Sequence, residues 1–128
     1  MILTIPCSAG EVIDKLTILE IKLARITDPA KLANVAREHA ALAAAWQQAV
    51  PDQAALAEPV AALRQVNETL WDVEDEIREH ERRDDFGAAF VALARSVYRT
   101  NDRRAELKRE INARLGSVLV EEKSYAAY

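Results

Sequence analysis

The chain has 128 residues, of which half are hydrophobic, 30% charged and 5% aromatic, with only three glycines. This composition is typical of one helical domain that buries about two thirds of its unfolded surface, and it excludes a disordered tail. The formal net charge of −4 argues against general nucleic-acid binding, so we expect no nucleic-acid partner. The apolar runs are too short to span a bilayer, and we expect no membrane insertion.

The cysteine and histidine content limits the kinds of site. A single cysteine, Cys7, excludes an intramolecular disulfide framework and suits a reducing compartment. The start, Met1–Thr4, lacks the basic region of a signal peptide, so we expect a cytoplasmic protein. His39 and His80 belong to no E-x-x-H pair, and no glycine-rich phosphate loop is present. We therefore expect neither a metal nor a cofactor.

A capping motif marks the start of the first helix. Ile2–Ile5 is short and apolar and is ended by Pro6, which indicates an extended lead-in. Ser8–Glu11 has the S-x-x-E form of a capping box, in which Ser8 accepts from the backbone of Glu11 and Glu11 reaches back to the Ser8 amide. The apolar stripe that follows has heptad spacing and consists of Val12, Leu16, Leu19, Leu23 and Ile26.

The later helices are bounded by Asp, Pro and Gly residues. Asp28 and Pro29 form an N-cap and a first helical residue, and so short a connection makes the first two helices antiparallel neighbours. We expect Asp84 and Asp85 to cap the fourth helix and Gly116 to end it. The expected helices span residues 8–26, 29–49, 59–83 and 85–115, all within a single domain of residues 1–128.

These boundaries predict an all-α fold in which two antiparallel helical hairpins form a four-helix bundle. The extended tail, residues 117–125, contains Val118–Val120, which is a candidate to pair with Ile2–Ile5 because each segment is too short to be stable alone. The fourth helix is about 45 Å long at ~1.5 Å per residue and exceeds its companions. Because part of it could serve a dimer contact, we expect a homo-oligomer.

The fourth helix carries an anomaly in its core stripe. The stripe begins at Phe86 and ends at Leu115, but Asn101, Arg104 and Lys108 stand in its middle at positions where leucine is expected. An inward-facing cation is costly unless it is paired or liganded. The anomaly therefore marks the place where a functional site is expected.

Other helices can supply partners for these side chains. If the third and fourth helices fold back on each other, Asn67 and Glu74 face the polar part of the fourth helix, and the start of the first helix adds Asp14 and Lys15. Such a site offers cations for an anion and carboxylates to orient them or to move protons. The candidate ligand-binding residues are Asp14, Lys15, Asn67, Glu74, Asn101, Arg104 and Lys108.

Two hypotheses about function follow, and no motif identifies a reaction, so the sequence leaves open whether the protein is an enzyme. The first is a site for an anionic metabolite, such as a sugar phosphate or a nucleotide sugar. The second is a homodimeric helical interaction module in which the polar cluster is a structural ion-pair network. Such networks are common in helical bundles that bind no ligand.

Four stretches of the chain also resemble a known family. They are Ser8–Lys22, which begins S-x-G-E-x-I-D-K, and Leu70–Arg78, Ala94–Tyr98 and Glu121–Tyr125. The stretches are similar to those of small bacterial helical proteins classed as a domain of unknown function. The resemblance implies an association with surface-polysaccharide and glycosyltransferase genes, and it implies no mechanism.

Overall fold

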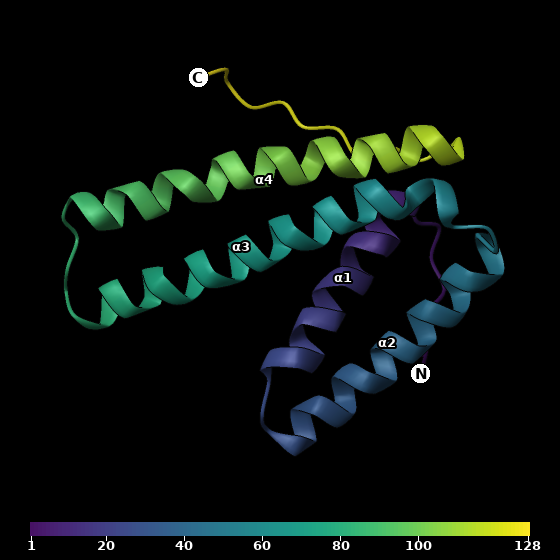
Figure 1. Ribbon diagram of the computed structural model, residues 1–128, viewed down its shortest axis with the longest axis horizontal. Helices are drawn as coiled ribbons and strands as arrows, with labels where there is room; N and C mark the ends of the chain where they lie inside the picture. The colour runs from purple at the N-terminus through teal and green to yellow at the C-terminus, as the bar shows by residue number, and fades with distance from the viewer.

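The computed structural model describes residues 1–128 and contains four α-helices and no strand. Figure 1 shows them as two antiparallel hairpins, the first formed by α1 and α2 and the second by α3 and α4. This arrangement confirms the predicted all-α class. The elements are α1 (Ala9–Arg25), α2 (Pro29–Ala49), the 3-10 turn η1 (Ala54–Leu56), α3 (Ala57–Arg82) and α4 (Ala88–Leu115).

Helix α1 is the centre of the fold, because it packs against all three other long helices. Helix α2 packs mainly against α1, and the α3–α4 hairpin extends well beyond the region that α1 covers (Figure 1). No helix combines the length and the hydropathy needed to cross a membrane. The main apolar core takes side chains from every element and consists of Ile13, Leu16, Trp46, Leu56, Leu63, Leu107 and Ile111.

The first two helices begin where their capping residues predict. The Ser8 hydroxyl accepts a hydrogen bond from the Glu11 backbone N–H at 3.3 Å, which satisfies one free donor of the first turn. The Asp28 carboxylate accepts from the backbone N–H groups of Ala30 and Lys31, and Pro29 is the first helical residue. The Asp28 cap starts α2 directly after the short loop that follows α1, which makes the two helices an antiparallel hairpin.

Helix α4 begins three residues later than the sequence predicts. Its N-cap is Gly87, and Asp84 and Asp85 belong instead to the turn after α3. Asp84 has a left-handed backbone with φ of 53°, and the Asp85 N–H donates to the His80 carbonyl at 3.0 Å. An Asp tolerates this conformation better than most residues, so the pair closes the hairpin rather than capping α4. Phe86 consequently lies in the exposed connection and not in a core stripe.

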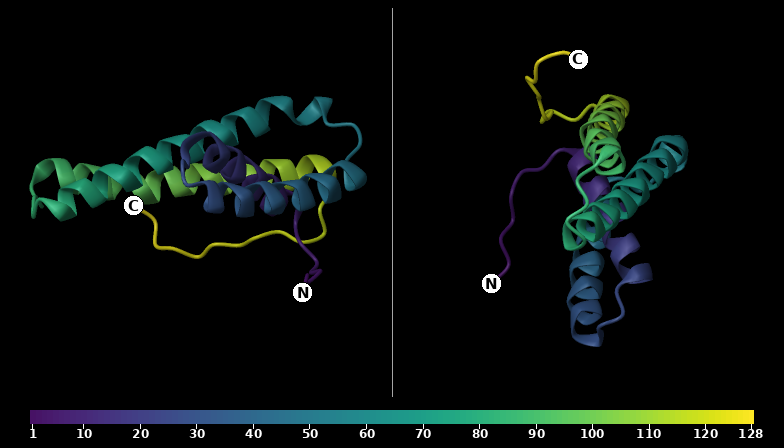
Figure 2. Two further views of the ribbon diagram at one scale, coloured as in Figure 1. Left: turned by 90° about the horizontal axis from the view of Figure 1, so that it is seen from below. Right: turned by 90° about the vertical axis from the view of Figure 1, so that its left-hand side faces the viewer.

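The two extended ends do not pair with each other. Gly116 has φ of 61°, a conformation that favours glycine, and after it the C-terminal tail turns back along α4. Figure 2 shows both ends on the same side of the helical body, and neither contains a strand. The expected pairing between Ile2–Ile5 and Val118–Val120 is therefore absent. Side-chain contacts with α4, described below, hold the tail in a different place.

Helices α1 and α4 approach each other most closely at Gly10. The Gly10 N–H donates to the side-chain oxygen of Asn112 at 2.6 Å, and both residues are buried. A Cβ atom built on Gly10 would lie 2.5 Å from the Lys108 carbonyl oxygen, which is part of the helix backbone. Glycine at this position thus sets the separation of the two helices.

Replacing Gly10 by alanine is therefore expected to destabilise the protein by roughly 1–3 kcal/mol, because α1 and α4 must move apart. Urea denaturation measures the change. Gly87→Ala is the control for added bulk, since its Cβ would meet only the Asp85 carboxylate at an ordinary 3.6 Å, and it should lose only the roughly 0.5 kcal/mol of a poorer helix N-cap. If Gly10→Ala were as stable as the wild type, the close approach would be wrong.

Candidate functional site

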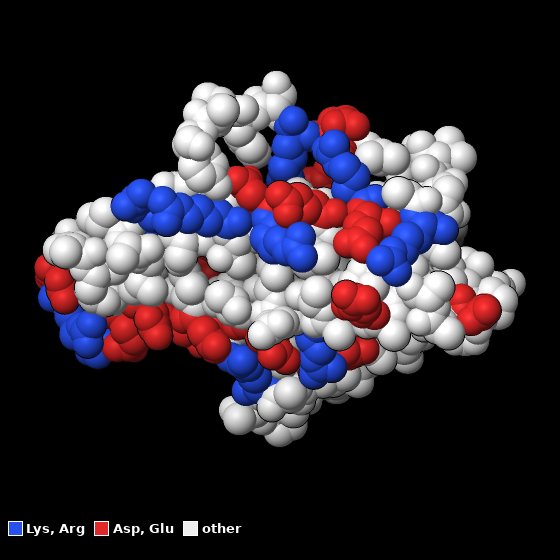
Figure 3. Space-filling view, turned by 45° about the horizontal axis from the view of Figure 1, so that its top comes forward, with Lys and Arg blue, Asp and Glu red and all other residues white.

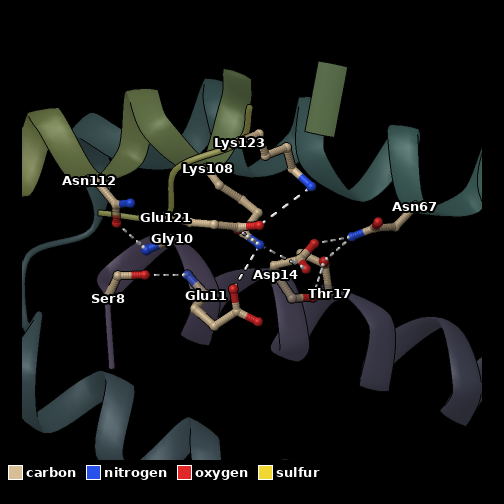
Figure 4. Close-up of polar contacts among 10 residues, drawn as sticks. All are labelled: Ser8, Gly10, Glu11, Asp14, Thr17, Asn67, Lys108, Asn112, Glu121 and Lys123. Atoms are coloured by element: carbon tan, nitrogen blue, oxygen red, sulfur yellow. Dashed lines mark hydrogen bonds and ion pairs between the residues drawn. The ribbon is translucent and has the colours of Figure 1, made fainter. Parts of the chain in front are cut away.

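A buried ammonium group lies where α1, α4 and the tail meet (Figure 4). Lys108 is only 7% exposed, and its Nζ lies 2.7 Å from the Glu11 carboxylate and 2.6 Å from the Glu121 carboxylate. The Asp14 carboxylate is further away, at 4.0 Å. We call these four residues, Glu11, Asp14, Lys108 and Glu121, the Lys108 cluster. The positive charge of Lys108 on α4 thus attracts carboxylates from both α1 and the tail.

Helix α3 reaches this cluster through Asn67. The Asn67 amide nitrogen donates to the Asp14 carboxylate at 2.8 Å and to the Thr17 hydroxyl at 2.9 Å. Thr17 in turn donates to the Asp14 backbone carbonyl at 2.8 Å. All three side chains are buried. Asp14 is therefore held by hydrogen bonds from α3 as well as by the nearby ammonium group.

The cluster changes the acidity of two of its members. Burial by itself would lower the pKa of Lys108, but the hydrogen bonds to Glu11 and Glu121 outweigh it, and the pKa is raised. The hydrogen bond from Lys108 lowers the pKa of Glu121 against the opposing effect of burial. Both shifts favour the charged forms, so the ion pair is fully formed at neutral pH.

The predicted capping box is only half formed. Ser8 caps α1 as expected, but the Glu11 carboxylate turns to Lys108 and does not return to the Ser8 amide. A carboxylate gains more from a charge-assisted contact with an ammonium group than from a hydrogen bond with a neutral backbone N–H. Glu11 is thus part of the cluster, a role that the capping motif alone does not indicate.

The structure divides the seven candidate residues among several places. Asp14, Asn67 and Lys108 come together in and beside the cluster. Lys15 is exposed and lies 3.9 Å from Glu38 of α2. Glu74 pairs within its own helix with Arg78, at 2.5 Å, and faces solvent. Asn101 and Arg104 line a separate hollow.

Sequence reasoning missed three residues that the site depends on. Leu107 is 1% exposed and belongs to the main apolar core, next in sequence to the buried Lys108. Asn112 bonds to Gly10, and its i+4 spacing from Lys108 is a signal that places both on one helix face. Glu121 has no such signal, because its contact depends on the path of the tail after Gly116.

A hollow of about 820 Å³ lies between α4 and the tail. Figure 3 shows the tail rising above the α4 surface, with Lys and Arg side chains beside it. We call this space the tail hollow. Its polar and aromatic lining comes from α4 and from the tail, and consists of Tyr98, Asn101, Asp102, Arg104, Lys123, Tyr125 and Tyr128.

Side chains alone hold the tail over this hollow. Besides the Lys108–Glu121 pair, Arg109 of α4 lies 3.3 Å from Glu122, and the Tyr128 hydroxyl donates to the Asp102 carboxylate of α4. No backbone–backbone hydrogen bond joins residues 118–128 to the helices. The tail is therefore attached at a few points and spans the space between them.

Arg104 is the cation of the hollow that has no carboxylate partner. Its neighbours on α4 are both paired, Arg103 with Glu106 at 3.1 Å and Lys108 with two glutamates. Arg104 is half-buried and belongs to no ion pair. Its guanidinium group is thus available to an anion that enters the hollow.

Comparison with known proteins identifies the family. The model of DUF6165, a family of unknown function, matches residues 3–128. The chain belongs to DUF6165. The match covers the Lys108 cluster and the tail hollow, so both lie within the DUF6165 domain. Neither the curated proteins nor the solved structures include a match to the chain.

The lowered pKa of Glu121 predicts a pH dependence for this DUF6165 protein. A carboxylate with a lowered pKa adds stability that is complete above its unfolded-state pKa and is lost as the pH falls through the lowered folded-state pKa. Glu121→Gln should therefore melt below the wild type at pH 7, and the difference should shrink as the pH falls below about 4.

Glu122→Gln is the matched control in the same pH series of thermal denaturations. Glu122 is 76% exposed and pairs only with Arg109, so it should have little effect at any pH. Equal melting temperatures for Glu121→Gln and the wild type at pH 7 would show that the Lys108–Glu121 pair does not hold the tail.

Proposed function

We propose that the protein binds an anionic metabolite, such as a sugar phosphate or a nucleotide sugar, in the tail hollow. The observation that carries the proposal is Arg104, a half-buried guanidinium group without a carboxylate partner at the wall of a hollow of about 820 Å³. Small-molecule sites commonly have volumes of about 300–1,000 Å³. The hollow is large enough for a phosphate group together with a ring.

The chemistry of the lining supports a phosphate-bearing ligand. A guanidinium group can bind two phosphate oxygens at once. Glu121 already pairs with Lys123, the other cation of the lining, so Arg104 is the cation that remains for a phosphate. Tyr98 and Tyr125 provide flat apolar surfaces for a ring and hydroxyl groups for polar contacts.

The Lys108 cluster has a different role in this proposal. Lys108 is already bound by two carboxylates, and three acids surround its single charge, so an added anion would meet repulsion there. The internal pairing supports the structural ion-pair network of the second hypothesis. The cluster fixes the tail, and the fixed tail forms one wall of the hollow.

The genomic association implied by the family resemblance is consistent with this ligand class. Enzymes that build surface polysaccharides use sugar phosphates and nucleotide sugars, so a protein encoded beside them would meet such molecules. This support is contextual. The geometry around Arg104 remains the reason for the proposal.

A homodimeric interaction module is the second candidate. It is supported by the apolar side chains that both extended ends leave exposed, including Ile2, Leu3 and Val118 at 78% or more. The two ends lie on the same side of the body, where a second copy could cover them (Figure 2). This candidate requires a dimer in sedimentation at micromolar concentration, and a monomer there would exclude it.

A hexose 1-phosphate or a nucleotide sugar at about ten times its Kd is expected to raise the melting temperature by roughly 5 °C. Arg104→Gln should abolish this rise, because the unpaired guanidinium group is lost. Differential scanning fluorimetry provides the measurement.

Arg103→Gln serves as the control for this experiment. Arg103 is adjacent in sequence but exposed and paired with Glu106, so its loss should leave the ligand-induced rise intact. The proposal fails if no phosphate-bearing ligand at millimolar concentration shifts the melting temperature of the wild type.

A further inference from the structure

The tail hollow already contains a hydroxyl-bearing ring that belongs to the protein. The Tyr128 hydroxyl donates a hydrogen bond to the Asp102 carboxylate at 2.5 Å. Its ring packs edge-on against Tyr98, with the ring centroids 5.1 Å apart. Asp102 and Tyr98 both lie on α4, so these two contacts attach the last residue of the tail to the helix inside the hollow.

This contact is polar and specific, but it has little support from its surroundings. Tyr128 is 76% exposed, and no backbone hydrogen bond holds the segment around it. The hydrogen bond to Asp102 raises the pKa of the Tyr128 hydroxyl, which stays protonated and a donor at neutral pH. A ligand that offers Asp102 an equivalent donor can therefore replace Tyr128 at low cost.

Asp102 defines what such a ligand must carry. An ionised carboxylate accepts hydrogen bonds and repels a phosphate, so its partner within the ligand must be a donor such as the hydroxyl group that Tyr128 now presents. Tyr98 provides the adjacent apolar surface on which a ring can lie. Arg104, two residues further along α4, lines the same hollow and can hold the phosphate.

We propose that Tyr128 is an internal competitor at this site, and that Asp102 selects phosphate-bearing ligands whose ring carries a hydroxyl group. The proposal rests on the proposed function, because it assumes that an anion binds near Arg104. It adds Asp102 as the residue that selects for a hydroxyl group on the ring of the ligand. It also adds an autoinhibitory contact that the ligand must displace.

Two probes of equal ring size test the selectivity. Isothermal titration compares glucose 1-phosphate, whose ring carries hydroxyl groups, with cyclohexyl phosphate, whose ring carries none. The wild type should bind glucose 1-phosphate about fivefold or more tightly than cyclohexyl phosphate, the value of one typical hydrogen bond in a solvent-exposed site. In Asp102→Ala the ratio of the two affinities should fall towards one. Glu106 lies outside the hollow, so the control Glu106→Ala should keep the wild-type ratio.

Variants of Tyr128 test the competition. Tyr128→Phe loses the hydrogen bond and Tyr128→Ala also loses the ring, so both should bind glucose 1-phosphate more tightly than the wild type, by about fivefold for the loss of one competing hydrogen bond. Circular dichroism checks that the variants keep their helices. Weaker binding by both variants would make Tyr128 a ligand contact and would overturn the competition.

The outcomes separate this inference from the proposed function. If both probes bind equally well and the Tyr128 variants bind glucose 1-phosphate with the affinity of the wild type, a phosphate site exists but the inference is wrong. If neither probe binds to the wild type or to Tyr128→Ala, the proposed function is wrong and the inference falls with it.

Discussion

The fold depends on the neutralisation of one buried charge. The Lys108 ammonium group is 7% exposed, and an unpaired charge at such a depth costs several kcal/mol. The two carboxylates closest to it come from outside its own helix, Glu11 from α1 and Glu121 from the tail. Because the charge must be paired, α4 is bound to α1 on one side and to the tail beyond Gly116 on the other.

Other features of the molecule follow from this arrangement. Glycine at position 10 lets the backbone of α1 approach α4, so the Glu11 carboxylate reaches the ammonium group (Figure 4). Asn67 holds Asp14 from α3 and thereby links the second hairpin to the first. The tail, attached at Glu121, forms the outer wall of the tail hollow. The Lys108–Glu121 ion pair thus positions the tail residues that line the candidate binding site.

Much of the fold could be predicted because it depends on local signals. Asp28 and Pro29 set the start of α2, and the heptad spacing along α1 reflects the helix that packs against all the others. The start of α4 was not predictable in the same way. Asp84 and Asp85 are good caps in isolation, but the closure of the hairpin uses them in a turn.

The candidate site could be predicted only in part, because its assembly is tertiary. The burial of Lys108 follows from its position in the stripe, and Asp14 and Asn67 were expected near it. One of its two closest partners, Glu121, lies beyond a left-handed glycine, and no helical periodicity continues through such a turn. The stripe of the fourth helix predicts Arg104 in the same cluster as Lys108, yet Arg104 lines the tail hollow instead.

The central claim is that Lys108 holds the tail against α4, and nuclear Overhauser effects between the rings of Tyr98 and Tyr128 test it most directly. In the ligand-free wild type at neutral pH these rings should show cross-peaks, because their centroids are 5.1 Å apart. In Lys108→Met the cross-peaks should weaken or vanish while the helical circular dichroism persists. Cross-peaks that are absent from the wild type, or unchanged in the variant, would contradict the account.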